Sequence, residues 1–129
     1  MDINEITKRT IGAAIEVHRN LGPGLLESTY QTCLLLELRN SKLYVESEKY
    51  IAINYKGIEL DKAYRIDLII EERLVVELKA VESLAPVHMA QVLTYMKLGQ
   101  YSHGLLINFN HSQLIQGVKR LIRSEFIKK

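Results

Sequence analysis

The chain has 129 residues, of which 47% are hydrophobic and 25% charged, a size and balance typical of a single globular domain spanning 1–129. This composition excludes a disordered or fibrous protein, and no apolar run approaches the roughly 20 residues that cross a bilayer. The N-terminus lacks the basic and then apolar order of a signal peptide, so we expect a cytoplasmic protein with no membrane partner. A formal net charge of +2 does not by itself indicate a nucleic-acid binder.

Two helices are predicted at the start of the chain. Apolar residues recur at helical spacing over residues 3–21, and the pair Gly22-Pro23 ends this run. A second helical pattern covers residues 24–40.

The hydrophobic pattern then changes to that of β-strands. Four strand segments are predicted, at residues 44–55, 58–60, 64–70 and 74–80. Lys56 and Gly57 form the first turn, and the polar triplet Glu71-Glu72-Arg73 suits a short hairpin loop between the last two strands. We therefore expect antiparallel pairing through this region.

A third helix, a buried strand and a variable tail complete the chain. Pro86 begins the helix and Gly99 follows its end, while residues 104–109 are apolar without alternation, as in a central strand that is covered on both faces. Residues 113–127 fit either a helix or a short helical turn followed by an edge strand. We predict the turn and strand, then a frayed end. This order of elements describes an α/β layer with a mixed sheet.

Basic residues crowd the end of the chain, at Lys119, Arg120, Arg123, Lys128 and Lys129. Such a cluster suggests a nucleic-acid surface, and a solvated face explains it equally well.

Charged residues also gather on the middle hairpin. Because side chains alternate along a strand, Arg65, Asp67 and Ile69 are predicted to face one way and the even-numbered residues the other. A three-residue loop places Asp67 opposite Glu77 and Arg65 opposite Lys79. A two-residue loop would force a carboxylate onto an apolar face, so the three-residue loop is predicted.

The predicted register pairs like charges, which is unfavourable by up to ~1 kcal/mol for each pair. A divalent cation shared by the two carboxylates would offset this repulsion, and without metal one acid should have a raised pKa. The alternative is a solvated face on which Asp67 reaches diagonally to Lys79, and Glu77 to Arg65, with no ligand. The hairpin alone leaves both interpretations open.

Two helical motifs add candidate residues. Gln91 and Tyr95 are four residues apart and share a helix face, and Glu27 and Tyr30 share another face shortly after Gly24. A helix surface, or a carboxylate that complements the helix dipole, explains each motif without a functional site.

Taken together, these residues resemble the PD-(D/E)xK nuclease superfamily, and within it the family named for the motif GxxExxY. The matching positions are Gly24, Glu27 and Tyr30 for GxxExxY, Asp67 and Glu77-Leu78-Lys79 for PD-(D/E)xK, and Gln91 and Tyr95 for the QxxxY of exonuclease-like members. Ile66 replaces the nominal proline. The resemblance implies a three-layer-like restriction-endonuclease/exonuclease fold of the α/β class, a mixed β-sheet flanked by helices in the order αβββαβ.

The resemblance also implies a mechanism, in which the chain hydrolyses phosphodiester bonds of DNA, with RNA less favoured, using Mg²⁺ that Mn²⁺ can replace. The implied metal ligands are Asp67, Glu77, the Leu78 carbonyl and Glu27. Lys79 would stabilise developing charge, Gln91 would orient the water or phosphate, and Tyr95 would hydrogen-bond the backbone. Accessory positions are His18, Tyr30 and Arg65, with a simple packing role as the alternative for His18.

The small net positive charge and the small size of the chain leave little basic surface to bind a duplex. We therefore expect a homodimer, a larger DNA-processing partner or a short single-stranded substrate. The alternative function is a nuclease-fold module with a weak or inactive site that binds nucleic acid or a protein partner.

Overall fold

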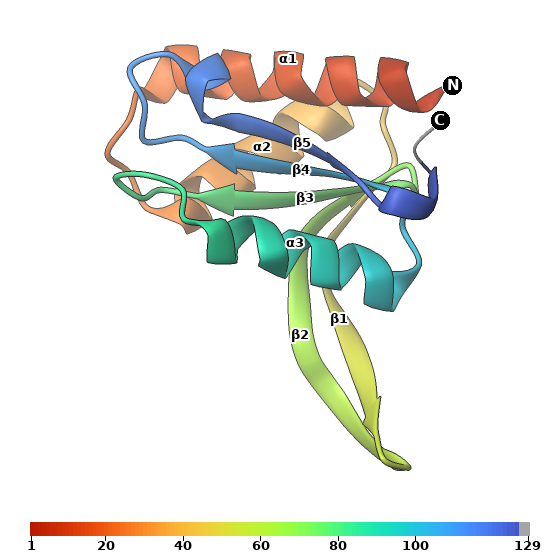
Figure 1. Ribbon diagram of the computed structural model, residues 1–129. Helices are drawn as coiled ribbons and strands as arrows, with labels where there is room; N and C mark the ends of the chain where they lie inside the picture. The colour runs from red at the N-terminus through yellow and green to blue at the C-terminus, as the bar shows by residue number, and fades with distance from the viewer. Residues whose placement is uncertain (127–129) are drawn as a thin grey trace.

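The computed structural model describes residues 1–126, and its helices and strands contain the predicted αβββαβ order, with one more helix at the start and one more strand at the end (Figure 1). The elements are α1 (Ile3–Leu21), α2 (Glu27–Asn40), β1 (Val45–Tyr55), β2 (Ile58–Ile70), β3 (Leu74–Lys79), α3 (Pro86–Gly99), β4 (His103–Asn108), the 3-10 turn η1 (Leu114–Gly117), β5 (Val118–Ile122) and the 3-10 turn η2 (Ser124–Phe126). The α/β fold class is confirmed.

The strands form one five-stranded mixed sheet in the order β1-β2-β3-β4-β5. Only the β3 and β4 pair is parallel within the described sheet, and α3 provides the crossover between these two strands. The helices α1 and α2 lie on one face and α3 lies on the other (Figure 1). The result is three layers, with the sheet in the middle.

Each sheet face has its own apolar cluster, because successive side chains of a buried strand point to opposite faces. In β4, Leu105 and Ile107 belong to the cluster under α1 and α2, whereas Leu106 belongs to the cluster under α3. All three side chains are fully buried. The prediction of a strand covered on both faces is therefore confirmed, with bounds His103–Asn108 in place of the predicted 104–109.

The predicted alternation fails in the middle of β2. Leu68 and Ile70 belong to the first cluster, but Ile66 lies with Ile69 in the second. On the neighbouring strand, the residue opposite this break is Glu48, whose φ of 55° is left-handed. The side chains of both strands change face at this point. The prediction that Ile66, Leu68 and Ile70 share one face is therefore wrong.

Beyond this break, β1 and β2 leave the body as a two-stranded arm, defined here as residues 49–65 (Figure 1). The predicted strand segments 58–60 and 64–70 are one continuous strand. A register shift between Ile51 and Ile53 and a left-handed φ of 55° at Lys62 absorb the extra residues. The irregular pattern that separated the two predicted segments is therefore a bulge.

The predicted turn and edge strand at the end of the chain are confirmed as η1 and β5. Lys119 and Arg120 are adjacent on β5, so they point to opposite faces and do not form one patch. Arg123 follows β5, where its backbone N–H donates to the Ser102 carbonyl oxygen at 3.1 Å. Ile127, Lys128 and Lys129 lie outside the described residues, so the predicted frayed end and the last two lysines of the basic cluster fall there.

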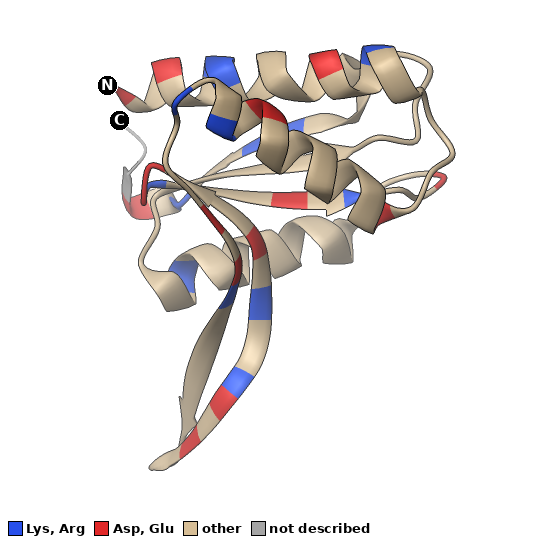
Figure 2. Ribbon diagram, turned by 180° about the vertical axis from the view of Figure 1, so that it is seen from behind, with Lys and Arg blue, Asp and Glu red and all other residues tan. Residues whose placement is uncertain are grey.

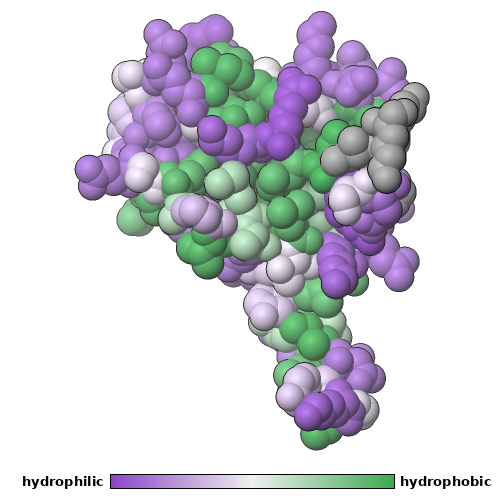
Figure 3. Space-filling view, viewed as in Figure 1, coloured by the Kyte–Doolittle hydropathy of each residue, from purple (hydrophilic) through white to green (hydrophobic). Residues whose placement is uncertain are grey.

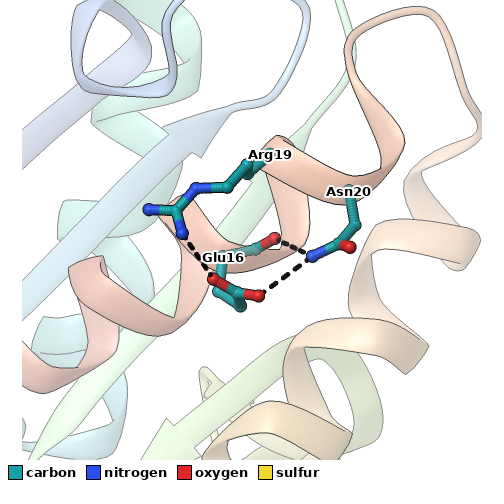
Figure 4. Close-up of polar contacts among 3 residues, drawn as sticks. All are labelled: Glu16, Arg19 and Asn20. Atoms are coloured by element: carbon teal, nitrogen blue, oxygen red, sulfur yellow. Dashed lines mark hydrogen bonds and ion pairs between the residues drawn. The ribbon is translucent and has the colours of Figure 1, made fainter.

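Three polar residues near the end of α1 contact one another (Figure 4). Arg19 Nη1 lies 3.2 Å from a Glu16 carboxylate oxygen, and Asn20 donates hydrogen bonds to the backbone and side chain of Glu16. No helix within residues 1–126 is long and apolar enough to cross a bilayer.

Candidate active site

The β2 and β3 strands pair over a short distance and then separate. Their ladder runs from Ile70 opposite Leu74 to Leu68 opposite Val76. The loop therefore contains the three residues 71–73, as predicted. The next pair in this register would be the two acids, and backbone pairing stops before it.

Asp67 and Glu77 occupy the opening between the two strands. The Leu78 N–H donates to Asp67 Oδ2 at 2.9 Å, and the Asp67 N–H donates to Glu77 Oε1 at 3.1 Å. Each carboxylate thus replaces a missing backbone partner on the opposite strand. One oxygen of each acid fixes the side chain, and the acids face one another as the register predicted.

Glu77 is deeply buried, with 4% of its surface exposed. Burial, followed by the charge of Asp67, raises the pKa of Glu77 to about 9. The raised pKa that was predicted for one of the two acids is confirmed. In the metal-free protein at neutral pH, the pair therefore holds a proton.

The basic residues of the hairpin contact other groups, although the charge of Lys79 acts on Glu77 in the direction that lowers its pKa. Arg65 lies across from Tyr50 on β1, and its Nη1 is 3.4 Å from Glu48 Oε1. Lys79 Nζ is 3.5 Å from Gln91 Oε1 on α3. Within residues 1–126, neither cation forms an ion pair with the two acids, so the diagonal pairs of the solvated-face alternative are wrong. The predicted position of Arg65 opposite Lys79 is wrong too, because the strands have already separated.

Helix α3 closes the site on its other side. Gln91 reaches Lys79, and Tyr95, one turn later, is buried with its ring centroid 5.3 Å from that of Tyr64. Burial raises the pKa of Tyr95, and the charges of Glu77 and Asp67 add to this effect. Of the two α3 residues that were singled out from their spacing, Tyr95 therefore lies near enough to the acids to feel their charge, and Gln91 contacts Lys79.

The GxxExxY segment builds the start of α2. Gly24 has a φ of 94°, which favours glycine. The Tyr30 hydroxyl donates to the Gly22 carbonyl oxygen at 2.6 Å and accepts from the Leu25 N–H at 3.1 Å. Tyr30 therefore clamps the loop that precedes Glu27, the first residue of the helix. Its contacts are structural.

A cleft of about 380 Å³ lies between α2 and the base of the arm. Its lining residues are Glu27, Ser28, Gln31, Thr32, Glu48, Arg65 and Asp67. Gln31 and Thr32 were not predicted, although their spacing of four from Glu27 and Ser28 was a usable signal. Glu48 was missed because nothing in the strand pattern reveals a left-handed residue.

His18 has a packing environment. Its Nε2 lies 2.8 Å from the His111 carbonyl oxygen, and its ring centroid is 6.5 Å from that of Phe109. These contacts fit the packing alternative, and a role at a metal stays a prediction.

Asn108 is a second residue that the sequence did not single out. It is fully buried and exchanges two hydrogen bonds with the Val81 backbone, at 3.0 and 2.9 Å. The neighbouring Phe109 N–H donates to the Lys79 carbonyl oxygen at 2.9 Å. These bonds hold the chain as it leaves β3 and thereby fix the backbone of Lys79.

The oxygen donors around Asp67 and Glu77 suit an open Mg²⁺ site, in which water and phosphate complete the coordination, and not a site closed by protein side chains. Among residues 1–126, no three His, Cys, Asp or Glu side chains are grouped to hold a metal by themselves, so Glu27 does not complete a trio with Asp67 and Glu77. Mg²⁺ commonly uses one or two carboxylates and takes its other oxygens from water and phosphate. The Leu78 carbonyl adds an oxygen, because it points to the same edge of β3 as the N–H that reaches Asp67.

A comparison with known protein families matches residues 4–121 to the family model described as the PD-(D/E)XK nuclease superfamily. The match contains every candidate site residue. Neither a curated protein nor a solved structure gives a match.

Proposed function

This chain belongs to the PD-(D/E)XK nuclease superfamily, and from that premise we propose that it is a metal-dependent nuclease that hydrolyses phosphodiester bonds, with DNA as the preferred substrate over RNA. The observation that carries the proposal is the pair of opposed carboxylates in the opening between β2 and β3, one of them buried, with a lysine two residues after the second acid. We propose the cytoplasm as its place of action.

We assign the metal position to Asp67, Glu77 and the Leu78 carbonyl, with Glu27 acting from across the cleft through a water molecule. Mg²⁺ is the proposed ion, and Mn²⁺ can replace it. When bound there, the ion would lower the pKa of a water molecule and polarise the scissile phosphate. The protein's own task is to hold two acids together in a buried place, where their mutual repulsion is relieved by a bound cation in place of the proton.

Lys79 is proposed to stabilise the charge that develops on the attacking oxygen or on the phosphate, a task that suits a compact ammonium. Its 3.5 Å contact with Gln91 supports this role, because the amide oxygen holds the ammonium beside the acids. Gln91 has an amide nitrogen to orient the water or phosphate. Tyr95, which lies near enough to Glu77 and Asp67 to feel their charge, is proposed to hydrogen-bond the backbone of the substrate.

The activity is tested by incubating the purified protein with Mg²⁺ or Mn²⁺ and linear, nicked and single-stranded DNA, together with RNA of the same sequence. We expect cleavage of DNA by the natural protein and loss of cleavage in Lys79→Ala and Asp67→Asn. Lys8→Ala, which removes an exposed lysine of α1, is the matched control and should cleave normally. Intact substrates in every reaction would reject the nuclease and favour the nucleic-acid or protein-binding module.

The metal position is tested separately by titrating Mn²⁺ into the protein in a calorimeter. Asp67→Asn keeps the size of the side chain and can still accept the Leu78 hydrogen bond, but it removes a charged ligand. Binding that is equally strong in this variant would reject the assigned position.

A further inference from the structure

The projecting arm holds the net positive charge of the chain. Between residues 49 and 65 the basic residues are Lys49, Lys56, Lys62 and Arg65, and the acidic residues are Glu59 and Asp61. This excess of two equals the formal net charge of +2, so the rest of the chain is balanced. Charged residues recur along the arm when it is viewed from the α2 side (Figure 2). A polyanion would therefore be attracted to the arm more than to the body.

The arm has two different faces, because directly paired residues of an antiparallel ladder share a face. One face is apolar and consists of the pairs Ile51–Tyr64, Ile53–Leu60 and Tyr55–Ile58. Ile51 and Tyr64 join it to the second apolar cluster beneath α3, and hydrophobic surface is visible on the arm from this side (Figure 3). The polar face is turned towards α2.

The polar face combines an aromatic ring with two cations. Tyr50 is 51% exposed and lies directly across from Arg65. Lys62 Nζ is 5.3 Å from the centroid of the Tyr50 ring. Arg65 also lines the cleft that contains Asp67. Arg65 therefore links the cleft to the Tyr50 ring and Lys62 farther out on the arm.

We propose that Tyr50, Lys62 and Arg65 bind a single strand of nucleic acid and lead it into the cleft. This inference rests on the proposed function and deepens it by naming the substrate class, an unpaired strand. An exposed tyrosine ring stacks on a base only when that base is unpaired, and cations beside the ring contact the flanking phosphates. The cleft of about 380 Å³ is at the small end of ligand pockets, which suits one strand and not a duplex.

The acidic residues near this surface limit its affinity for a nucleic-acid strand. Glu48 lies 3.4 Å from Arg65, and Glu59 and Asp61 lie farther out along the arm. A phosphate must compete with the Glu48 carboxylate for Arg65, so the affinity is moderate and falls as salt rises. Glu48→Gln should therefore strengthen binding of a single strand by severalfold.

Binding is tested by fluorescence anisotropy with a fluorescein-labelled 20-nucleotide oligothymidine, with and without its complement, in EDTA so that cleavage does not interfere. We expect the single strand to bind at least tenfold more tightly than the duplex. Tyr50→Ala should weaken single-strand binding by about tenfold, because a stacking ring is lost. Lys62→Ala should reduce the slope of log affinity against log salt by about 0.7, the value for one phosphate contact on a single strand.

The arm contains its own matched control. Lys56 Nζ lies 5.4 Å from the centroid of the Tyr55 ring, so this pair has the same composition as Lys62 and Tyr50 and nearly the same separation. Both lysines have a positive φ, so replacement by alanine disturbs the backbone equally. Tyr55 lies on the apolar face. Tyr55→Ala and Lys56→Ala should change single-strand affinity by less than twofold.

In the binding assay, equal losses in the two pairs, or unchanged affinity in Tyr50→Ala, would overturn the proposal. Light scattering gives a further test. If Tyr50→Ala changes the oligomeric state but not the affinity for DNA, the proposal is overturned, because the arm would then serve protein association. If single-strand binding depends on Tyr50 but no metal-dependent cleavage occurs, the arm assignment stands and the nuclease proposal falls. If cleavage occurs and Tyr50→Ala leaves the KM unchanged, the nuclease proposal stands and the arm assignment falls.

Discussion

The two halves of β2 occupy opposite environments within one strand. In the inner half, Ile66, Leu68, Ile69 and Ile70 are fully buried, whereas residues 58–65 are exposed along their whole length. The inner half stabilises the fold, and the outer half has little to pack against, as expected of a hairpin that projects from its domain. The candidate active site lies where the two environments meet, at Asp67. Substitutions in the two halves should therefore affect different properties.

The largest expected difference is in catalysis. Lys79→Ala, at the end of β3, should lower kcat by about 10²–10³, because it removes the charge placed to stabilise the transition state. Tyr50→Ala on the arm should raise KM with kcat nearly unchanged, since it removes binding that substrate and transition state share. Steady-state kinetics on a single-stranded substrate measure both. An equal fall in kcat for the two variants would remove the distinction between site and arm.

The next difference is in stability and uses two leucines of the same strand. Leu68→Ala should lower the free energy of unfolding by about 2–5 kcal/mol, because it leaves a cavity in the first apolar cluster. Leu60→Ala, on the arm, should change it by no more than about 0.5 kcal/mol, since this side chain is 48% exposed. Denaturation by urea measures both. A large loss in Leu60→Ala would mean that the arm is packed against something in solution.

The dependence of stability on pH should come from the site. The pKa of Glu77 is raised in the folded state, so between about pH 4.5 and pH 9 the unfolded chain releases a proton that the folded chain retains. The contribution of Glu77 to stability is therefore complete below its unfolded pKa and is lost as pH rises towards the folded pKa. Without metal, the natural protein should lose more than about 1 kcal/mol relative to Glu77→Gln between pH 5 and pH 8.

Urea denaturation of both proteins in EDTA at these two pH values isolates this effect, because groups that the two proteins share cancel in the difference. Added Mg²⁺ should reduce the loss at pH 8, since a cation takes the place of the proton. Parallel pH profiles for the natural protein and the variant would contradict a raised pKa at Glu77.

The smallest expected effect concerns the loop before α2. Tyr30→Phe keeps the ring, whose centroid is 4.3 Å from that of Phe109, but removes the hydroxyl bonds to Gly22 and Leu25. We expect a loss of about 1 kcal/mol in stability, as for a net hydrogen bond. Thermal unfolding measures this, and Tyr44→Phe, at a tyrosine that is 54% exposed, is the control. No difference between the two would reject the clamp.

Much of the fold and part of the site followed from local patterns. The helices, the three-residue loop and the facing acids were predictable because periodicity, turn chemistry and register depend on residues close in sequence. Gln91 was suggested by its spacing and by resemblance. Its contact with Lys79 was not predictable, because the crossing of α3 over the sheet brings them together.

By itself, the sequence determined the order of elements, the buried strands and the placement of like charges on one hairpin, since each depends on the identity and spacing of neighbouring residues. Only the tertiary structure decided that β2 and β3 separate at those charges, because strand pairing depends on the whole sheet. There β1 has a left-handed residue, Glu48, opposite the break in alternation. It also decided that β2 extends into a free arm, since burial depends on what the remaining chain covers. Both contributions apply to Asp67. The register of the hairpin, which follows from the sequence, places Glu77 opposite it, and the separation of β2 and β3 leaves the two acids in an opening between the strands.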